Sequence, residues 1–321
     1  MSSNFSQFDR SRLAVQPLEQ RKHLLDLSSI LPLNPVVTSE ENLQVVASRI
    51  RSAKKCGKAV VLMMGAHVLR SGVQRYLIDL VEKGYVNCIA MNGAGIIHDF
   101  EFALIGATTE SVAKYIRDGR FGLWKETGII NEIVNSAAKD NLGIGEAVGK
   151  YIVENNFPNL EISLLAASYR CGCPVTVHVG IGYDILHEHP NCDGAAFGQT
   201  SYIDFLRFAK ILESLEGGVV MNFGSAVMAP EVYLKALTMV RNVAHQENRS
   251  ITDFTVLVCD LARLPDDYRK EADRETLDYY FRPWKTMLIR TVAEGGESFY
   301  VRGNHISTIP QLWSAISLQH V

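Results

Sequence analysis

Unbroken apolar segments alternate along this chain with segments that have the spacing of amphipathic helices. Residues 59–64 and 86–91 are apolar at nearly every position, and residues 71–83 between them show helical spacing that ends at Gly84. Strands without a polar face are buried on both sides, which is typical of a parallel sheet covered by helices. We therefore expect an α/β fold with a doubly wound parallel sheet.

The same alternation starts earlier and continues to the C-terminus. Thr38 and Glu41 have the spacing of a capping box before a predicted helix at 45–55. Further helices are expected at 160–169, 202–215 and 231–243, strands at 175–179, 218–223 and 255–260, and a last strand and helix within 299–316. Residues 108–156 carry helical patterns broken by glycines, which predicts a helical insertion.

The domain organisation follows from what the chain lacks. No proline- or serine-rich linker and no internal repeat interrupts the series of elements. The sequence therefore predicts one α/β domain over residues 38–321, preceded by an N-terminal extension at residues 1–37.

Composition excludes several classes of function. A net charge of −3 and a pI near 6.3 give no broad positive field for nucleic acid. No apolar run is long enough to span a bilayer, and residues 1–12 lack a signal-peptide pattern. We expect a cytoplasmic protein that binds neither nucleic acid nor membrane, with its six cysteines reduced.

Four loops that mix small and polar residues follow, or lie close after, predicted strands. They are residues 65–67, 92–95, 180–184 and 222–225. In a parallel sheet, ligands bind at the carboxyl ends of the strands, and small residues let a phosphate or ribose approach the backbone. These loops predict a nucleotide site. For any one of them, a tight turn that needs a positive φ is an equal alternative.

A series of motifs resembles the deoxyhypusine synthase family over most of residues 40–318. The motifs are residues 64–72, residues 92–95 with Asp99, Cys173-Pro174-Val175, Asp184, residues 218–225, Trp284-Lys285, Gly303-Asn304 and Ile309-Pro310. The resemblance implies a Rossmann-like NAD-binding fold, NAD as cofactor and a homotetramer. It also implies a transferase that passes the aminobutyl group of a polyamine, through a lysine imine, to a lysine of an acceptor protein.

The resemblance assigns roles to individual residues. It implies cofactor contacts at Gly65, Asn92, Gly93, Gly95, Gly224, Ser225 and Asn304, and substrate contacts at Trp284, His98 and His178. Lys285 is the expected imine former, and Asp184 is expected to hold an ammonium group. Several acidic residues of the family are replaced here, so we expect a small amine other than spermidine as substrate. The alternative for Lys285 is a surface lysine at a helix start, with Pro283 at the first helical position.

Two other functions stay open at this point. One is a non-catalytic nucleotide-binding or regulatory protein that keeps the fold but not the chemistry. The other is a metal-assisted hydrolase that uses the cluster His178, His187, His189, Cys192 and Asp193. The spacing of that cluster matches no established zinc pattern, so we assign no metal ligand. The aromatic segment 279–284 is the expected contact surface of the homotetramer.

Overall fold

The computed structural model describes residues 5–318 and contains a six-stranded parallel sheet. Its strands are β2 (Val60–Met64), β3 (Cys88–Met91), β5 (Val175–Val177), β6 (Val219–Phe223), β7 (Thr255–Asp260) and β8 (Glu297–Arg302). They lie in the order β5-β3-β2-β6-β7-β8, and every pair is parallel. This is the strand order of the doubly wound Rossmann fold, as expected from the sequence.

Successive side chains of the strands enter two separate cores. In β2, Leu62 and Met64 pack into one core, whereas Val61 and Met63 pack into the other. Because side chains of a strand alternate between faces, an apolar residue at every position is what a sheet covered on both faces requires. The unbroken apolar segments of the sequence are therefore explained.

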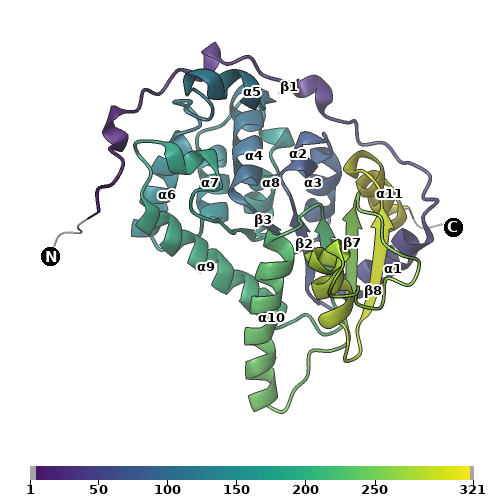
Figure 1. Cartoon of the computed structure of the whole chain (residues 1–321). Helices are drawn as coiled ribbons and strands as arrows, with labels where there is room; N and C mark the ends of the chain where they lie inside the picture. Colours follow the sequence, from purple (N-terminus) through teal and green to yellow (C-terminus); the bar gives the residue numbers. More distant parts are fainter. Residues whose placement is uncertain (1–4, 319–321) are drawn as a thin grey trace.

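Helices cover both faces of the sheet. The first core is closed by α1 (Glu41–Lys55), α3 (Gln74–Glu82), α4 (Gly93–Ile105), α6 (Ile129–Lys139), α7 (Ile144–Glu154), α8 (Leu164–Cys171) and α11 (His305–Ser317). The second core is closed by α9 (Gly194–Leu212), α10 (Met228–Gln246) and the π-helix η8 (Pro283–Arg290). In Figure 1, α9 and α10 (green) lie next to each other, and α1 and α11 lie together beside β8.

Short elements connect the larger ones. The single-turn helices are α2 (His67–Arg70) and α5 (Val112–Tyr115), with 3-10 turns at Arg10–Arg12, Leu18–Gln20, Leu27–Ser29, Ile116–Asp118, Leu160–Ile162, Ile185–Glu188 (η6) and Leu277–Tyr280.

The expected capping box of α1 is wrong. Glu40 is the N-cap and makes no side-chain bond, while the Thr38 hydroxyl donates to the carbonyl oxygen of Gln311.

The N-terminal segment is tied to the rest of the molecule. Residues 5–37 run along its outside, past α5 and on towards α1 (Figure 1, purple). Within this segment, β1 (Leu25–Asp26) pairs antiparallel with β4 (Ala107–Thr108), which is a short strand at the start of the expected helical insertion. The domain boundary at residue 38 stays a prediction.

Among residues 5–318 no helix has the length and apolar character needed to cross a membrane.

Candidate functional site

β2 and β6 are neighbours at the centre of the sheet, and the chain leaves them in opposite directions. From β2 it continues to β3 on one side, and from β6 it continues to β7 on the other side. In open α/β sheets, ligands bind in the crevice outside the carboxyl ends of such a pair of strands. The site is therefore expected among the residues that follow Met64 and Phe223.

Two glycines allow the loops after these strands to approach each other. The Gly65 amide donates to the carbonyl oxygen of Phe223 at 3.0 Å, and a Cβ atom on Gly65 would lie 2.6 Å from the carbonyl oxygen of Gly224. Gly224 has a φ of 67°, in the left-handed region that favours glycine. A side chain on Gly65 would push the two loops apart.

A cavity of about 560 Å³ opens at this crevice, and we call it the switch-point cavity. Its walls come from the segments after four neighbouring strands, within 65–70, 92–98, 178–184 and 224–232. An adjoining cavity of about 540 Å³ shares Arg70 and Gly224 with it and extends to Asn304, beyond β8. Cavities of this size are typical of cofactor and substrate sites.

Most of the residues expected to contact a cofactor meet here. Gly65, Asn92, Gly224 and Ser225 line the switch-point cavity, and Asn304 lines the adjoining one. The amide group of Asn92 accepts a bond from the Gly95 backbone amide at 3.2 Å, which caps α4.

The expected cofactor contacts of Gly93 and Gly95 stay a prediction, and the structure shows how these glycines allow close packing. Residues 93–95 form the first turn of α4 instead of a loop, and neither glycine lines the cavity. A Cβ atom on Gly95 would lie 2.8 Å from the sulfur of Met91, so this glycine lets α4 pack closely on β3. The missing side chain of Gly93 leaves room for the carboxylate of Asp184.

Asp184 lies at the N-terminus of α4, on the wall of the switch-point cavity. Its carboxylate accepts a bond from the Ala94 backbone amide, where the helix dipole favours a negative charge. Burial is the larger effect, and it raises the pKa of Asp184 to about 6. At pH 7 this carboxylate is mostly ionised, and it takes up a proton readily.

Two neutral histidines face the same cavity. Burial lowers the pKa of His98 and of His178 to about 4. His98 Nδ1 lies 2.9 Å from the Thr108 hydroxyl, which donates its own proton to Glu101. Nδ1 of His98 therefore carries the proton, and its Nε2 is an acceptor.

Two buried nitrogens at the cleft have no hydrogen-bond partner. They are Nε of Arg70, which lines both cavities, and Nδ1 of His305, which lines the adjoining one. Arg70 makes no ion pair with any acid of the described chain, and its Nη1 contacts Nε2 of His67. The sequence motifs assign no role to either residue, although Arg70 lies six positions after the end of β2. Unpaired buried donors at a cleft indicate room for an acceptor from a ligand.

Lys285 and Trp284 line neither the switch-point cavity nor the adjoining one. Trp284 is part of the second core, and its indole N–H donates to the carbonyl oxygen of Tyr268. Nζ of Lys285 lies 3.9 Å from the ring centroid of Tyr279, and Lys285 lines neither cavity. Pro283 occupies the first helical position of η8, as the alternative reading expected. The imine role of Lys285 stays a prediction, and within one chain it lacks a link to the cleft.

In the histidine cluster of residues 178–193, His187 and His189 make hydrogen bonds within the protein. His187 Nδ1 accepts bonds from the amides of Gly182 and Asp184, and His189 Nε2 contacts the carbonyl oxygen of Gly122. Over the part of the chain that the structure describes, no three His, Cys, Asp or Glu residues are placed to hold a metal ion. All six cysteines lie in this part and are free of disulfides.

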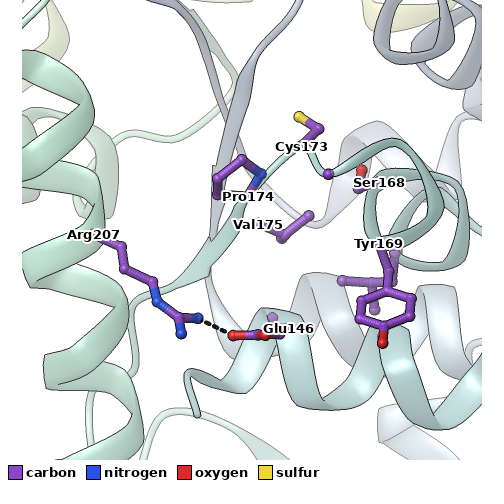
Figure 2. A pocket seen from close by; sticks show the side chains of 10 residues that line it. Glu146, Ser168, Tyr169, Cys173, Pro174, Val175 and Arg207 are labelled. Atoms are coloured by element: carbon purple, nitrogen blue, oxygen red, sulfur yellow. Dashed lines mark ion pairs between the residues drawn. The ribbon is translucent and has the colours of Figure 1, made fainter.

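A further pocket lies at the opposite edge of the sheet, before and along edge strand β5. Figure 2 shows it with Pro174 and Val175 on one side, Tyr169 on another, and the ion pair between Glu146 and Arg207. Its volume is about 260 Å³. Because it lies at the amino end of a strand and its two charged side chains are paired with each other, it does not compete with the cleft as the nucleotide site.

Comparison with known proteins supports the fold. A family model described as "Arginine dihydrolase ArgZ-like, C-terminal, Rossmann fold" matches residues 44–157. That segment holds β2, β3 and the helices between β2 and β5 up to α7. No curated protein sequence matches this chain.

Several solved structures are similar at low sequence identity. Unliganded AgrE is 17% identical, with 87% of this chain and 33% of AgrE covered and a TM-score of 0.51. AgrE has also been crystallised as a ternary complex with ornithine and NAD+, at 16% identity, 87% and 34% coverage and a TM-score of 0.49. This chain thus spans about a third of the length of AgrE.

Two other similar structures come from named organisms. A conserved putative LOR/SDH protein from Methanococcus maripaludis S2 is 14% identical, with 89% of this chain and 73% of that protein covered and a TM-score of 0.50. A putative deoxyhypusine synthase from Entamoeba histolytica is 12% identical, with 85% and 86% covered and a TM-score of 0.45. The family model that matches this chain is that of ArgZ-like Rossmann domains, in place of the expected deoxyhypusine synthases.

Proposed function

We propose that this chain binds NAD at the switch-point cavity and uses it to oxidise a small amine. The observation that carries the proposal is the position of that cavity, at the carboxyl ends of β2 and β6 where the strand order reverses. AgrE, whose unliganded form resembles this chain, forms a complex with ornithine and NAD+. That complex motivates the choice of NAD among nucleotides.

The residues of the cleft fit a dinucleotide. The 19-residue helix α10 begins at the cavity wall, just after the glycine loop that ends β6, so its dipole favours a negative charge such as a pyrophosphate there. Of its first amides, that of Ala229 already donates to the Ser225 hydroxyl, and Pro230 has no N–H. Nδ1 of His305, which has no partner on the wall of the adjoining cavity, offers a free position to a ribose or base. The N-terminus of α4 is unsuited to a phosphate, because the carboxylate of Asp184 already occupies it.

Bound NAD+ would supply a two-electron acceptor for the hydride of a C–H bond next to nitrogen. As that bond breaks, the amine nitrogen loses a proton and a C=N bond forms. Asp184 is the proposed proton acceptor, since it lines the cavity and its pKa is about 6. His98 and His178 stay neutral and can orient polar groups of the substrate.

The proposal does not include transfer of an aminoalkyl group to an acceptor. Transfer of an aminoalkyl group to an acceptor lysine needs a lysine at the cleft, and Lys285 does not line it. We therefore propose oxidation as the core reaction and leave transfer, and the name of the amine, outside it. The dihydrolase activity in the family description belongs to the whole ArgZ-like protein, of which the matched model is a C-terminal part.

Calorimetric titration with NAD+ tests the proposal. Ala226 is exposed and lines the cavity, so Ala226→Phe fills the site without disturbing the core. We expect this variant to weaken NAD+ binding at least about tenfold, or 1.4 kcal/mol. The matched control is Ala293→Phe, at an exposed alanine before β8 on the opposite edge, which should bind as the native chain does.

Two results would overturn the proposal. One is the absence of NAD+ binding to the native chain at millimolar concentration. The other is equal binding by the native chain and Ala226→Phe. NADH formation at 340 nm with a panel of amines then separates an enzyme from a non-catalytic nucleotide-binding protein.

A further inference from the structure

A side cavity of about 260 Å³ adjoins the switch-point cavity. The two share Arg70, Ala94, His98, Tyr183 and Asp184 in their walls. The volume is about nine times the share of one molecule in liquid water, so it suits a small molecule. The rest of its wall comes from the segment that follows β4 and from Arg21, Ile97, Glu101, Phe121 and Ile185.

Glu110 presents a buried carboxylate to this cavity. Its side chain is one of the wall residues and only 8% of the residue surface is exposed. Oε1 accepts bonds from the Gly122 amide and the Trp124 indole, at 3.0 and 2.8 Å. Oε2 is buried and has no hydrogen-bond partner. An unpaired buried carboxylate oxygen is costly, so it indicates a donor that arrives with a ligand.

Thr109, the residue before Glu110, has a strained backbone and an unpaired hydroxyl. Thr109 has a φ of 68°, in the left-handed region that a β-branched residue rarely adopts, and its buried hydroxyl has no partner. Its carbonyl oxygen accepts the Leu24 amide, which fixes the backbone there. Such local strain is common at ligand sites. Thr109, Glu110 and Arg70 thus all line this small cavity, and each has a buried polar atom without a hydrogen-bond partner.

The remaining charges of the wall are already balanced. Arg21 and Glu101 form a buried two-bond ion pair at 2.9 and 2.7 Å, and the hydroxyls of Thr108 and Thr127 complete the shell of Glu101. The cavity therefore offers acceptors at Glu110 and Asp184 and a donor at Arg70. This pattern fits a ligand with a protonated amine at one end and an anionic group at the other.

We propose that the side cavity is the substrate subsite and that it takes a small zwitterion, a compound with both an ammonium and a carboxylate group. Glu110 and Asp184 bind the ammonium group, so that the amine lies beside the proposed proton acceptor, and Arg70 binds the carboxylate. Asp184 and His98 lie in the walls of both cavities, so a substrate held this way is next to the bound NAD. This inference rests on the function proposed above.

Binding measurements on the NAD+-saturated chain test it. The probes are the straight-chain ω-amino acids from glycine to 6-aminohexanoate, each compared with the alkylamine and the carboxylate of equal chain length. We expect at least one amino acid to bind at least tenfold more tightly than both of its counterparts. Glu110→Gln keeps an acceptor for Gly122 and Trp124 but removes the charge. It should weaken that binding at least tenfold and leave NAD+ affinity unchanged.

A second variant does not depend on the buried carboxylate. Val112 is exposed and lines the side cavity, so Val112→Trp should narrow it and weaken amino-acid binding. The adjacent Ala113→Trp is the matched control, because Ala113 is exposed on the same short helix and does not line the cavity.

The two proposals fail in different ways. NAD+ binding without a preferred zwitterion, or with one that binds equally well to Glu110→Gln and Val112→Trp, overturns the substrate assignment alone. Loss of NAD+ binding itself overturns the proposed function.

Discussion

At the scale of single residues, Asp204 is a buried acid that holds two elements together. Its Oδ2 accepts bonds from the amides of Gly145, at the start of α7, and Val177, on edge strand β5, at 3.2 and 3.0 Å. Burial is the largest effect on this carboxyl group and raises its pKa to about 7. Oδ1 has no partner, so a neutral side chain is tolerated there.

The raised pKa of Asp204 predicts a pH dependence of stability. Between about pH 4 and 7 the unfolded chain has released this proton while the folded chain keeps it, so the free energy of unfolding falls as pH rises. The contribution is at most about 1.4 kcal/mol per pH unit. Asp204→Asn should remove it, which urea unfolding at pH 5, 6 and 7 will show as a flatter curve. Parallel curves for the two proteins would contradict this assignment.

The sequence predicted the small residues of the cleft and, through the family resemblance, Asp184, but not the other charged groups. Gly65 and Gly224 follow apolar strands and could be found from the sequence alone. Glu110 and Asp204 gain their properties from contacts far along the chain, with Trp124 and Val177, so no local pattern indicates them. The imine role of Lys285 stays a prediction, and its neighbour Trp284 packs in the second core.

At the scale of elements, close packing of α7 on β5 depends on Gly145. A Cβ atom there would overlap the carbonyl oxygen of Val175. Gly145→Ala should therefore lower the free energy of unfolding by about 1–3 kcal/mol. The control is Gly198→Ala on α9, where a Cβ atom meets nothing within 4 Å and alanine is the better helix former. That variant should gain about 0.5–1 kcal/mol. Denaturant unfolding of both proteins gives the comparison, and equal effects would contradict it.

Element prediction succeeded where apolar periodicity was clear and failed at α4. The six expected sheet strands and most helices are confirmed within a few residues. The start of α4 reads as a loop because Gly93 and Gly95 are weak helix formers, yet both are required by contacts with Asp184 and Met91. Tertiary packing decided the local structure there.

At the scale of the whole molecule, apolar side chains surround the cleft. Ile181, Val227, Leu261 and Ile306 are each more than half exposed, on the segments after β5, β6, β7 and β8. An exposed apolar rim of this kind favours burial against a second copy of the chain. We predict a homotetramer, with a light-scattering mass four times the 35.7 kDa of one chain, and a smaller species for Leu261→Asp. A stable monomer at micromolar concentration would count against it.

The unbroken apolar strands predicted a doubly wound parallel sheet, whereas the strand order is seen only in the structure. The position of the cleft follows from that order, and NAD binding at the cleft is the central claim. Diffraction from crystals grown with NAD+ tests this claim most directly. We predict dinucleotide density across the carboxyl ends of β2 and β6, in contact with Gly224 and Ser225. Density only in the pocket beside β5, or none at saturating NAD+, would contradict it.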